Sequence, residues 1–234
     1  MSLLGEQHLF VRGSNGVTLP VHLITFDIEY FCPEAFAATG IACPPSVARA
    51  VRSRQAEFYF GRLAARSVLA ALNAPPGEVS VGASREPVWP PGIVGSISHT
   101  HAIAAAAALR REVCSGVGID IEVVANPDAC AALMATVVSK QELNYLQTLI
   151  GILPINTLMT AVFSAKESLF KGAYDAVGRY FDFTAARVVR IDMERQSILL
   201  QLTETLCDAF VYRQLCEIAF SLIIPDIVMT SYVW

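Results

Sequence analysis

The sequence predicts a fold that combines β-strands with α-helices, and three observations carry this prediction. Residues 17–28 and 116–124 alternate apolar and polar side chains, which is the pattern of a strand with one buried face. Residues 46–73 and 156–178 instead repeat their apolar side chains with the period of an α-helix. Residues 187–234 are predicted to form three or four further strands separated by turns.

The composition fits one large domain, or two small ones, with a substantial core. The chain has 234 residues, of which 54% are hydrophobic and 16% charged, and its mean hydropathy is +0.48. No unbroken apolar stretch is long enough for a membrane-spanning helix, and the first residues lack an apolar export signal. The net charge of −4 gives nucleic-acid binding no electrostatic support. We therefore expect a cytoplasmic protein that binds no nucleic acid and does not insert stably into membranes.

The strand at residues 116–124 carries two carboxylates on one side. Its alternation places Asp120 and Glu122 on the same face, roughly 7 Å apart along the strand. Neighbouring carboxylates repel each other unless a cation lies between them or water surrounds them. A half-solvated strand explains the pair equally well by spacing alone. Asp27 and Glu29 repeat this spacing without flanking glycines, and we interpret them as a solvated strand end.

The first predicted helix, residues 46–73, carries two arginines where apolar side chains are expected. Ser46 is the expected N-cap, and Asn73 is the expected end of the helix. Arg54 lies inside the apolar stripe, and Arg62 lies at its edge. Such arginines either extend to water past an apolar surface or bind an anion in a cleft, and the helix alone favours neither.

A loop and a pair of strands follow the first helix. Residues 82–91 are too rich in proline and glycine for a regular element, and Arg85 lies on this loop. Residues 93–109 are predicted to form one or two strands, with Ser98 and His99 at the junction between them. The second of these strands is expected to pair antiparallel with the acidic strand, because the connection between them has hairpin length. These polar side chains suit either a ligand site or an ordinary surface.

The second predicted helix, residues 156–178, contains the strongest anomaly of the sequence. Gly178 is its expected end, and Lys166 lies at the centre of its apolar stripe. A buried lysine must find an anion, because desolvation of an unpaired charge is costly. Glu167 and Lys171 lie together on the flank of the stripe, four residues apart, where a surface ion pair would also place them.

Together these side chains suit metal-assisted chemistry on a phosphate. Three carboxylates match an oxygen-preferring cation such as Mg²⁺, and lysines and arginines match phosphate oxygens. Both features serve phosphoryl-type transfer. The chain contains no G-x-x-x-x-G-K-[ST] motif, so it is not a P-loop enzyme.

Several segments also resemble one enzyme family in order along the chain. GVGIDIE at residues 116–122 and FSAKESLFK at 163–171 resemble the two-part signature of the 4′-phosphopantetheinyl transferases. RQAEFYFGRLAAR at 54–66, REPVWP at 85–90 and GSISH at 95–99 resemble upstream segments of the larger, monomeric class of that family. The resemblance covers about residues 46–178, and each segment alone is modest evidence.

The resemblance implies a fold, a reaction and a set of partners. The fold is an α+β pseudo-dimer of two similar halves, residues 1–115 and 116–234, each a small antiparallel sheet packed with a long helix. The enzyme would be a monomer with its active site at the junction. It would transfer 4′-phosphopantetheine from coenzyme A to a serine of an apo acyl, peptidyl or aryl carrier protein, releasing adenosine 3′,5′-bisphosphate. The reaction would depend on Mg²⁺, with Mn²⁺ as a possible substitute.

The resemblance also implies roles for particular residues. The expected metal ligands are Asp120, Glu122 and Glu167. The expected coenzyme A ligands are Arg54, Arg62, Arg85, Ser98, His99, Asp120, Lys166 and Lys171. The proton acceptor is Glu167, directly or through a water, or Lys171, and the sequence does not choose between them. Two other kinds of protein fit the same residues. One is a different Mg²⁺-dependent enzyme acting on a nucleotide or diphosphate, and the other is a non-catalytic protein that binds coenzyme A or a carrier.

Overall fold

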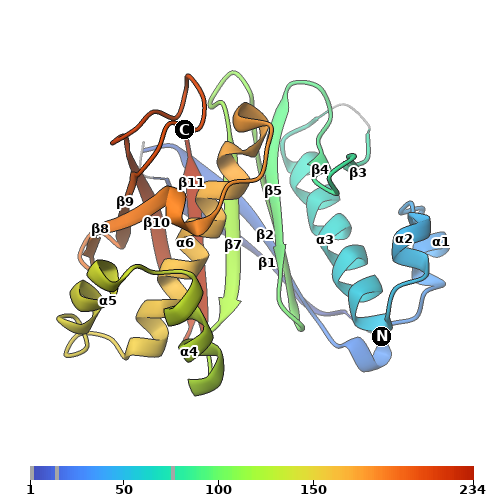
Figure 1. The fold of residues 1–234 in the computed structure, drawn as a ribbon. Helices are drawn as coiled ribbons and strands as arrows, with labels where there is room; N and C mark the ends of the chain where they lie inside the picture. Colours follow the sequence, from blue (N-terminus) through green and yellow to red (C-terminus); the bar gives the residue numbers. More distant parts are fainter. Residues whose placement is uncertain (1–2, 14–15, 75–76) are drawn as a thin grey trace. The chain divides into compact units, whose positions relative to one another are not determined.

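The chain folds as two compact units. The computed structural model describes residues 3–13, 16–74 and 77–234. Contacts between residues divide these into one unit of Met1–Val11 with Thr18–Val117, and a second of Arg12–Val17 with Gly118–Trp234. Each unit contains one main sheet and one long helix (Figure 1). The predicted mixture of strands and helices is therefore confirmed. Within the described ranges, no helix combines the length and the apolar content that crossing a membrane requires.

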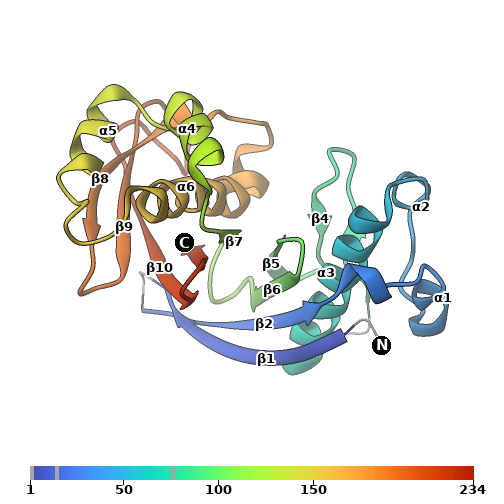
Figure 2. The same cartoon turned by 90° about the horizontal axis from the view of Figure 1, so that it is seen from below.

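The sheet of the first unit has four strands, and one long helix covers it. The strands follow the order β1 (Leu3–Arg12), β2 (Thr18–Phe26), β6 (Ile103–Arg110) and β5 (Ile93–His99). Helix α3 (Arg52–Ala71) packs against β6 and β2, as Figure 2 shows from below. The shorter elements are η1 (Ile28–Tyr30), α1 (Ala35–Thr39), α2 (Pro45–Ala48) and the β3–β4 pair (Ser80–Val81 and Pro87–Val88). The alanines of β6 are buried, which lets the helix approach this strand closely.

The first long helix begins later than the sequence predicts. A one-turn helix, α2, precedes α3, and its N-cap is Pro44 rather than Ser46. At the break, the side-chain amide of Gln55 donates to the carbonyl of Ala48, the last residue of α2, and to that of Ala50, which satisfies carbonyls that a continuous helix would otherwise pair. The predicted end is confirmed: α3 stops at Ala71, and Asn73 adopts a left-handed conformation with φ of 48°.

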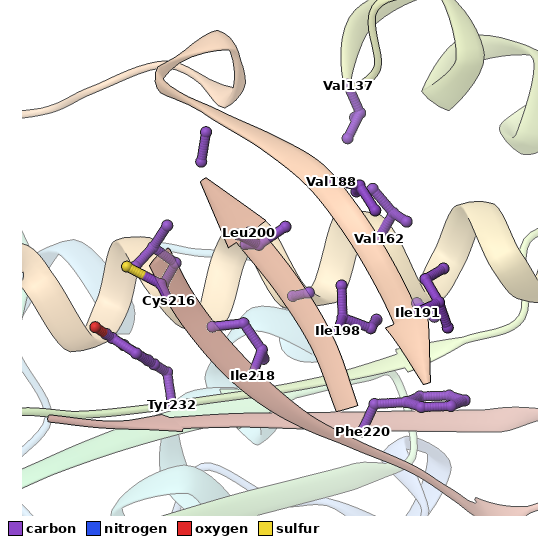
Figure 3. Close-up of a cluster of buried hydrophobic side chains, with 14 of the residues drawn as sticks. Val137, Val162, Val188, Ile191, Ile198, Leu200, Cys216, Ile218, Phe220 and Tyr232 are labelled. Atoms are coloured by element: carbon purple, nitrogen blue, oxygen red, sulfur yellow. The ribbon is translucent and has the colours of Figure 1, made fainter. Parts of the chain in front are cut away.

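The second unit is a five-stranded sheet with a long helix against it. The strand order is β7 (Val117–Val123), β11 (Ile227–Val233), β10 (Leu215–Ile224), β9 (Ser197–Leu202) and β8 (Ala186–Asp192). Helix α6 (Ile155–Val177) packs on this sheet, and apolar side chains of β8, β9 and β10 gather beside it in Figure 3. Shorter elements are α4 (Pro127–Thr136), α5 (Lys140–Gln147) and η2 (Phe183–Ala185). The predicted helix end at Gly178 is confirmed by its left-handed φ of 67°.

One predicted strand pairing is wrong. The strand that precedes the acidic strand, β6, lies between β2 and β5, so both of its hydrogen-bonding edges are occupied. The acidic strand β7 instead neighbours β11, from the far end of the chain. A hairpin-length connection was a poor guide here because β6 is an interior strand of its own sheet. The strand β1 was not predicted, and its exposed Leu4 and Phe10 weaken the alternation that would have revealed it.

The backbones of β7 and α6 approach each other through two glycines. A Cβ added to Gly118 would lie 1.9 Å from the carbonyl oxygen of Ser168 and 2.6 Å from the amide nitrogen of Gly172. A Cβ added to Gly172 would in turn lie 3.1 Å from the amide nitrogen of Gly118. The face of β7 that carries its acidic residues is therefore covered by α6 rather than half-solvated.

Replacing Gly118 with alanine is expected to destabilise the protein by about 1–3 kcal/mol or more, because backbone atoms must move to admit the methyl group. The midpoint of urea unfolding measures this loss. Gly151→Ala is the matched control, since nothing lies within 4 Å of a Cβ added there. Equal unfolding midpoints for the two variants would contradict the close contact between β7 and α6.

Candidate functional site

The second unit brings together the predicted acids of β7 and α6. Asp120 is only 3% exposed, and its Oδ1 accepts a hydrogen bond of 2.6 Å from Nζ of Lys171. Glu122 lies two residues further along the same face of β7, and Glu167 lies one helical turn before Lys171 on α6. Both glutamates are partly buried. The strand and the helix thus supply three carboxylates and one ammonium group to a single region.

The pKa values show that these carboxylates interact electrostatically. The pKa of Glu122 is raised to about 7, chiefly by burial and then by the charges of Asp120 and Glu167, while Lys171 opposes the rise. Burial likewise raises the pKa of Glu167, Lys171 lowers it, and Asp120 raises it. One ammonium group faces three mutually repelling carboxylates, so the region favours an additional cation.

Glu122 gives the metal-free protein a defined pH dependence. Its folded pKa of about 7 lies above the ordinary value of 4.5, so between these values the folded state keeps a proton that the unfolded chain releases. This contribution to stability is present below pH 4.5 and is lost as the pH rises through about 7. In chelator, the free energy of unfolding of the native protein should therefore fall more between about pH 5 and pH 8 than that of Glu122→Gln. Parallel pH curves from urea unfolding would contradict the raised pKa.

Lys166 has a different environment from the one that the resemblance implies. It is 3% exposed, and its Nζ lies 2.9 Å from Oε1 of Glu142. The same ammonium group donates to the carbonyls of Val137 at 2.7 Å and Phe183 at 3.2 Å. Its three donors therefore contact protein groups in this structure, which gives Lys166 a structural ion pair, and the expectation that it binds coenzyme A stays a prediction. The requirement for an anion is confirmed, but the anion is a side chain.

Glu142 is the residue that the sequence did not connect to this lysine. Ser139 and Glu142 form a capping box at the start of α5, as the S-x-x-E spacing of the sequence indicates. Beyond capping, Oε1 of Glu142 accepts from the amide of Val188, so the carboxylate joins α5, α6 and β8. Burial raises the pKa of Glu142, but Lys166 and the backbone donors outweigh it and leave the pKa below its usual value. The capping-box spacing was the only indication of Glu142 in the sequence, and this spacing does not indicate its contact with Lys166.

The acidic side chains of β7 and α6 have the donor chemistry of a divalent-cation site. Among residues 3–13, 16–74 and 77–234, no group of three or more His, Cys, Asp and Glu side chains is arranged to hold a metal ion. The chemistry nevertheless suits Mg²⁺, because the nearby acids offer only oxygen ligands and repel one another.

A small pocket of the second unit lies beside Glu167. It holds about 210 Å³ and is bounded on one side by α6 and on the other by residues 180–183. Its aromatic lining consists of Phe170, Tyr180, Phe181 and Phe183. The pocket therefore offers an apolar wall next to a carboxylate of the acidic cluster.

The first unit gathers four of the predicted coenzyme A ligands around another pocket. This pocket of about 330 Å³ is lined by Arg54, Arg62, Arg85 and His99, among others. Arg54 Nη1 lies 2.8 Å from Nε2 of His99, and Glu57 lies near both, 3.4 Å from Arg54 and 3.6 Å from His99. Glu57 was missed, although its position three residues after Arg54 is a recognisable ion-pair spacing. A concave surface with three arginines suits an anionic ligand.

Ser98 does not join this group. It is buried on β5 next to His99, and neighbouring residues of a strand point to opposite faces of the sheet. Ile97 and His99 line the pocket, so Ser98 points away from it. Asp27 has a local role, because its Oδ1 accepts from the amide of Glu29 and caps η1. The interpretation of Asp27 as a strand end is thereby supported.

Sequence comparisons identify the class of protein to which this fold, its acidic residues on β7 and α6 and its arginine-lined pocket belong. A family model described as the 4′-phosphopantetheinyl transferase N-terminal domain matches residues 44–109. A second, described as the 4′-phosphopantetheinyl transferase superfamily, matches residues 116–222. Enterobactin synthase component D of Escherichia coli O157:H7 is 31% identical over 155 residues, which are 65% of this chain and 70% of that protein. The chain belongs to the 4′-phosphopantetheinyl transferase family.

Two further relatives match shorter stretches. The 4′-phosphopantetheinyl transferase Svp of Streptomyces mobaraensis is 37% identical over 142 residues, 61% of this chain and 57% of the relative. Enterobactin synthase component D of Salmonella typhi is 37% identical over 128 residues, 54% of this chain and 51% of the relative. The matched part of the chain thus spans little more than half the length of these two relatives.

Proposed function

We propose that the protein transfers 4′-phosphopantetheine from coenzyme A to a serine hydroxyl of an apo carrier protein. In the reaction, a bond forms between the serine oxygen and the phosphorus that bears pantetheine. The bond from that phosphorus to the bridging oxygen breaks, and adenosine 3′,5′-bisphosphate leaves. The observation that carries the proposal is the 2.6 Å ion pair of Asp120 and Lys171 between β7 and α6, two elements that also carry Glu122 and Glu167, in a chain that belongs to this family.

The arginine-lined pocket of the first unit is assigned to the nucleotide end of coenzyme A. Arg54, Arg62 and Arg85 line it and supply positive charge for the phosphate groups. Burial and the charge of Arg54 lower the pKa of Arg62 to about 10, yet Arg62 stays charged near neutral pH. His99, hydrogen-bonded to Arg54, fixes the direction of that guanidinium. Ser98 remains part of the proposal only through the family resemblance.

Mg²⁺ is assigned to Asp120, Glu122 and Glu167. When bound, it would neutralise pyrophosphate oxygens and stabilise the charge that develops during transfer. Lys171 already balances part of the negative charge through its ion pair with Asp120. The aromatic pocket beside Glu167 suits the uncharged pantetheine chain, whose methyl and methylene groups would lie on its apolar wall.

Glu167 is the better candidate for accepting the proton of the serine hydroxyl. A protonated lysine that donates to a buried carboxylate has no lone pair to accept a proton, which describes Lys171 in its contact with Asp120. Burial raises the pKa of Glu167 and so increases its affinity for a proton. We therefore assign proton transfer to Glu167, directly or through a water, and orientation of Asp120 to Lys171.

The partners and cellular setting follow from the same proposal. The protein acceptor is an acyl carrier protein or a peptidyl or aryl carrier domain of a siderophore, peptide, polyketide or fatty-acid synthase. We propose a cytoplasmic monomer, with the two predicted halves at residues 1–115 and 116–234 as the two copies of a pseudo-dimer.

An intact-mass assay tests the function. The protein is incubated with coenzyme A, Mg²⁺ and apo forms of several carrier domains, and the expected result is a mass gain of one phosphopantetheine unit on the carrier serine. Substitution of that serine by alanine in the carrier should abolish the gain. Calorimetric binding of coenzyme A without any transfer would overturn the proposal in favour of a non-catalytic binding protein.

A further inference from the structure

The first unit contains a second pocket that the proposed reaction does not use. It has a volume of about 250 Å³ and lies between α3, residues 41–44 and residues 77–81. Its lining is largely apolar, with Ile41, Phe58, Leu69, Val79 and Val81 among the contributing residues. Of these, Ile41, Leu69 and Val79 belong to the buried core. An apolar pocket of this size suits a small organic molecule rather than a chain of coenzyme A length.

Charge in this pocket is uneven. Arg66 and Glu78 line it and neutralise each other through a contact of 2.9 Å, and the other carboxylate oxygen of Glu78 accepts from the amide of Ala42 at 3.4 Å. Arg62 also lines it, and no carboxylate of the described residues lies within ion-pair distance of this guanidinium. The lining therefore carries two guanidinium groups and one carboxylate, which leaves one positive charge in excess, although Glu78 attracts Arg62 from beyond contact distance.

The donors of Arg62 are also incompletely used. Its Nη2 donates to the carbonyl of Ser80 at 3.2 Å, and its guanidinium lies 4.5 Å from the ring centroid of Phe58. Its Nε is buried and has no hydrogen-bond acceptor within the described residues. A buried N–H group without an acceptor costs free energy, so a ligand oxygen that reached it would bind favourably.

We infer that this pocket binds a small organic carboxylate with an aromatic or branched apolar body. The carboxylate would pair with Arg62, and the body would replace water against Leu69 and Val79. Arg62, Phe58 and Val81 line this pocket and the arginine-lined pocket alike. A ligand held by Arg62 therefore competes for a side chain that the coenzyme A site needs, and this second step rests on the proposed function.

Benzoate is the probe, and its neutral analogue benzamide is the matched comparison. Ligand-observed and amide NMR of the full chain should show benzoate binding with a Kd on the order of 1 mM, with shifts at the amides of Val79 and Ser80. Benzamide should bind at least ~10-fold more weakly, because it cannot form the ion pair. Absence of benzoate binding, or equal binding of the two probes, would overturn the inference.

Two alanines on the surface provide the matched variants. Ala42 is exposed and lines this pocket but not its neighbour, so Ala42→Leu should fill the space and weaken benzoate binding at least ~10-fold. Ala48 is exposed on α2 and lines neither pocket, so Ala48→Leu should bind benzoate as the native protein does. Unchanged benzoate binding in Ala42→Leu would place the probe elsewhere and refute the site.

The coupling to coenzyme A is measured separately. Benzoate should raise the KM for coenzyme A without changing kcat at saturating coenzyme A, and Ala42→Leu should remove this effect. If benzoate binds as expected but no carrier is modified by the native protein, the proposed function fails and the site stands. If transfer occurs and benzoate binds without altering the KM, the coupling through Arg62 is refuted.

Discussion

Asp120→Asn is expected to lower kcat/KM for phosphopantetheine transfer by roughly 1000-fold or more. The substitution keeps the shape of the side chain but removes the charge that pairs with Lys171 and that we assign to Mg²⁺. Asp120 is only 3% exposed, so the lost charge is replaced by neither solvent nor an exposed side chain. Steady-state transfer to a carrier domain, measured by mass spectrometry, gives the effect.

Asp27→Asn is the control for this experiment. Asp27 and Glu29 have the same spacing as Asp120 and Glu122, but Asp27 caps a short helix through the amide of Glu29. An asparagine can make the same capping contact, so transfer should be unchanged. A comparable loss in both variants would mean that the wrong acidic pair has been assigned to the site.

Lys166→Met is expected to destabilise the fold by about 3–5 kcal/mol. The substitution preserves the length and apolar packing of the side chain but leaves the carboxylate of Glu142 buried without its cation. The midpoint and slope of urea unfolding measure the change. Lys171→Met should cost less, because the side chain of Lys171 is 26% exposed and water can reach the carboxylate it leaves.

A double variant separates the structural role of Lys166 from phosphate binding. Lys166→Met with Glu142→Gln removes both charges, so it should recover most of the lost stability. If Lys166→Met instead leaves unfolding unchanged and raises the KM for coenzyme A, Lys166 binds phosphate and the assignment of the ion pair as its role is wrong.

Local patterns predicted the elements well, but not the contacts between them. The alternation around Asp120 and the apolar stripe around Lys166 located β7 and α6, because burial on one face leaves a period in the sequence. Neither pattern indicates which other part of the chain packs against the strand or the helix. The partner of Lys166 lies on α5, and the neighbour of β7 is β11, more than a hundred positions along the chain.

For the candidate site as well, the sequence predicted individual residues better than the contacts between them. Three arginines and His99 were singled out from misplaced charges and from the family resemblance, and the structure places them around one pocket. The contacts of Glu57 and Glu142 were not predicted, because glutamates are common on helices. Only their neighbours in the folded chain distinguish these two. Ser98 was singled out by position beside His99, where the pleat of a strand sends adjacent side chains in opposite directions.

The glycine contact between β7 and α6 bears on how this protein can change over generations. At Gly118 and Gly172 the main chains themselves meet, so the separation between the acidic residues of the strand and those of the helix is set by backbone atoms. Neighbouring core positions such as Ile119 and Leu169 can exchange one apolar side chain for another without altering that separation. Substitutions in the surrounding core can therefore accumulate with little effect on the spacing of these acidic residues, whereas substitutions at Gly118 and Gly172 would change it directly.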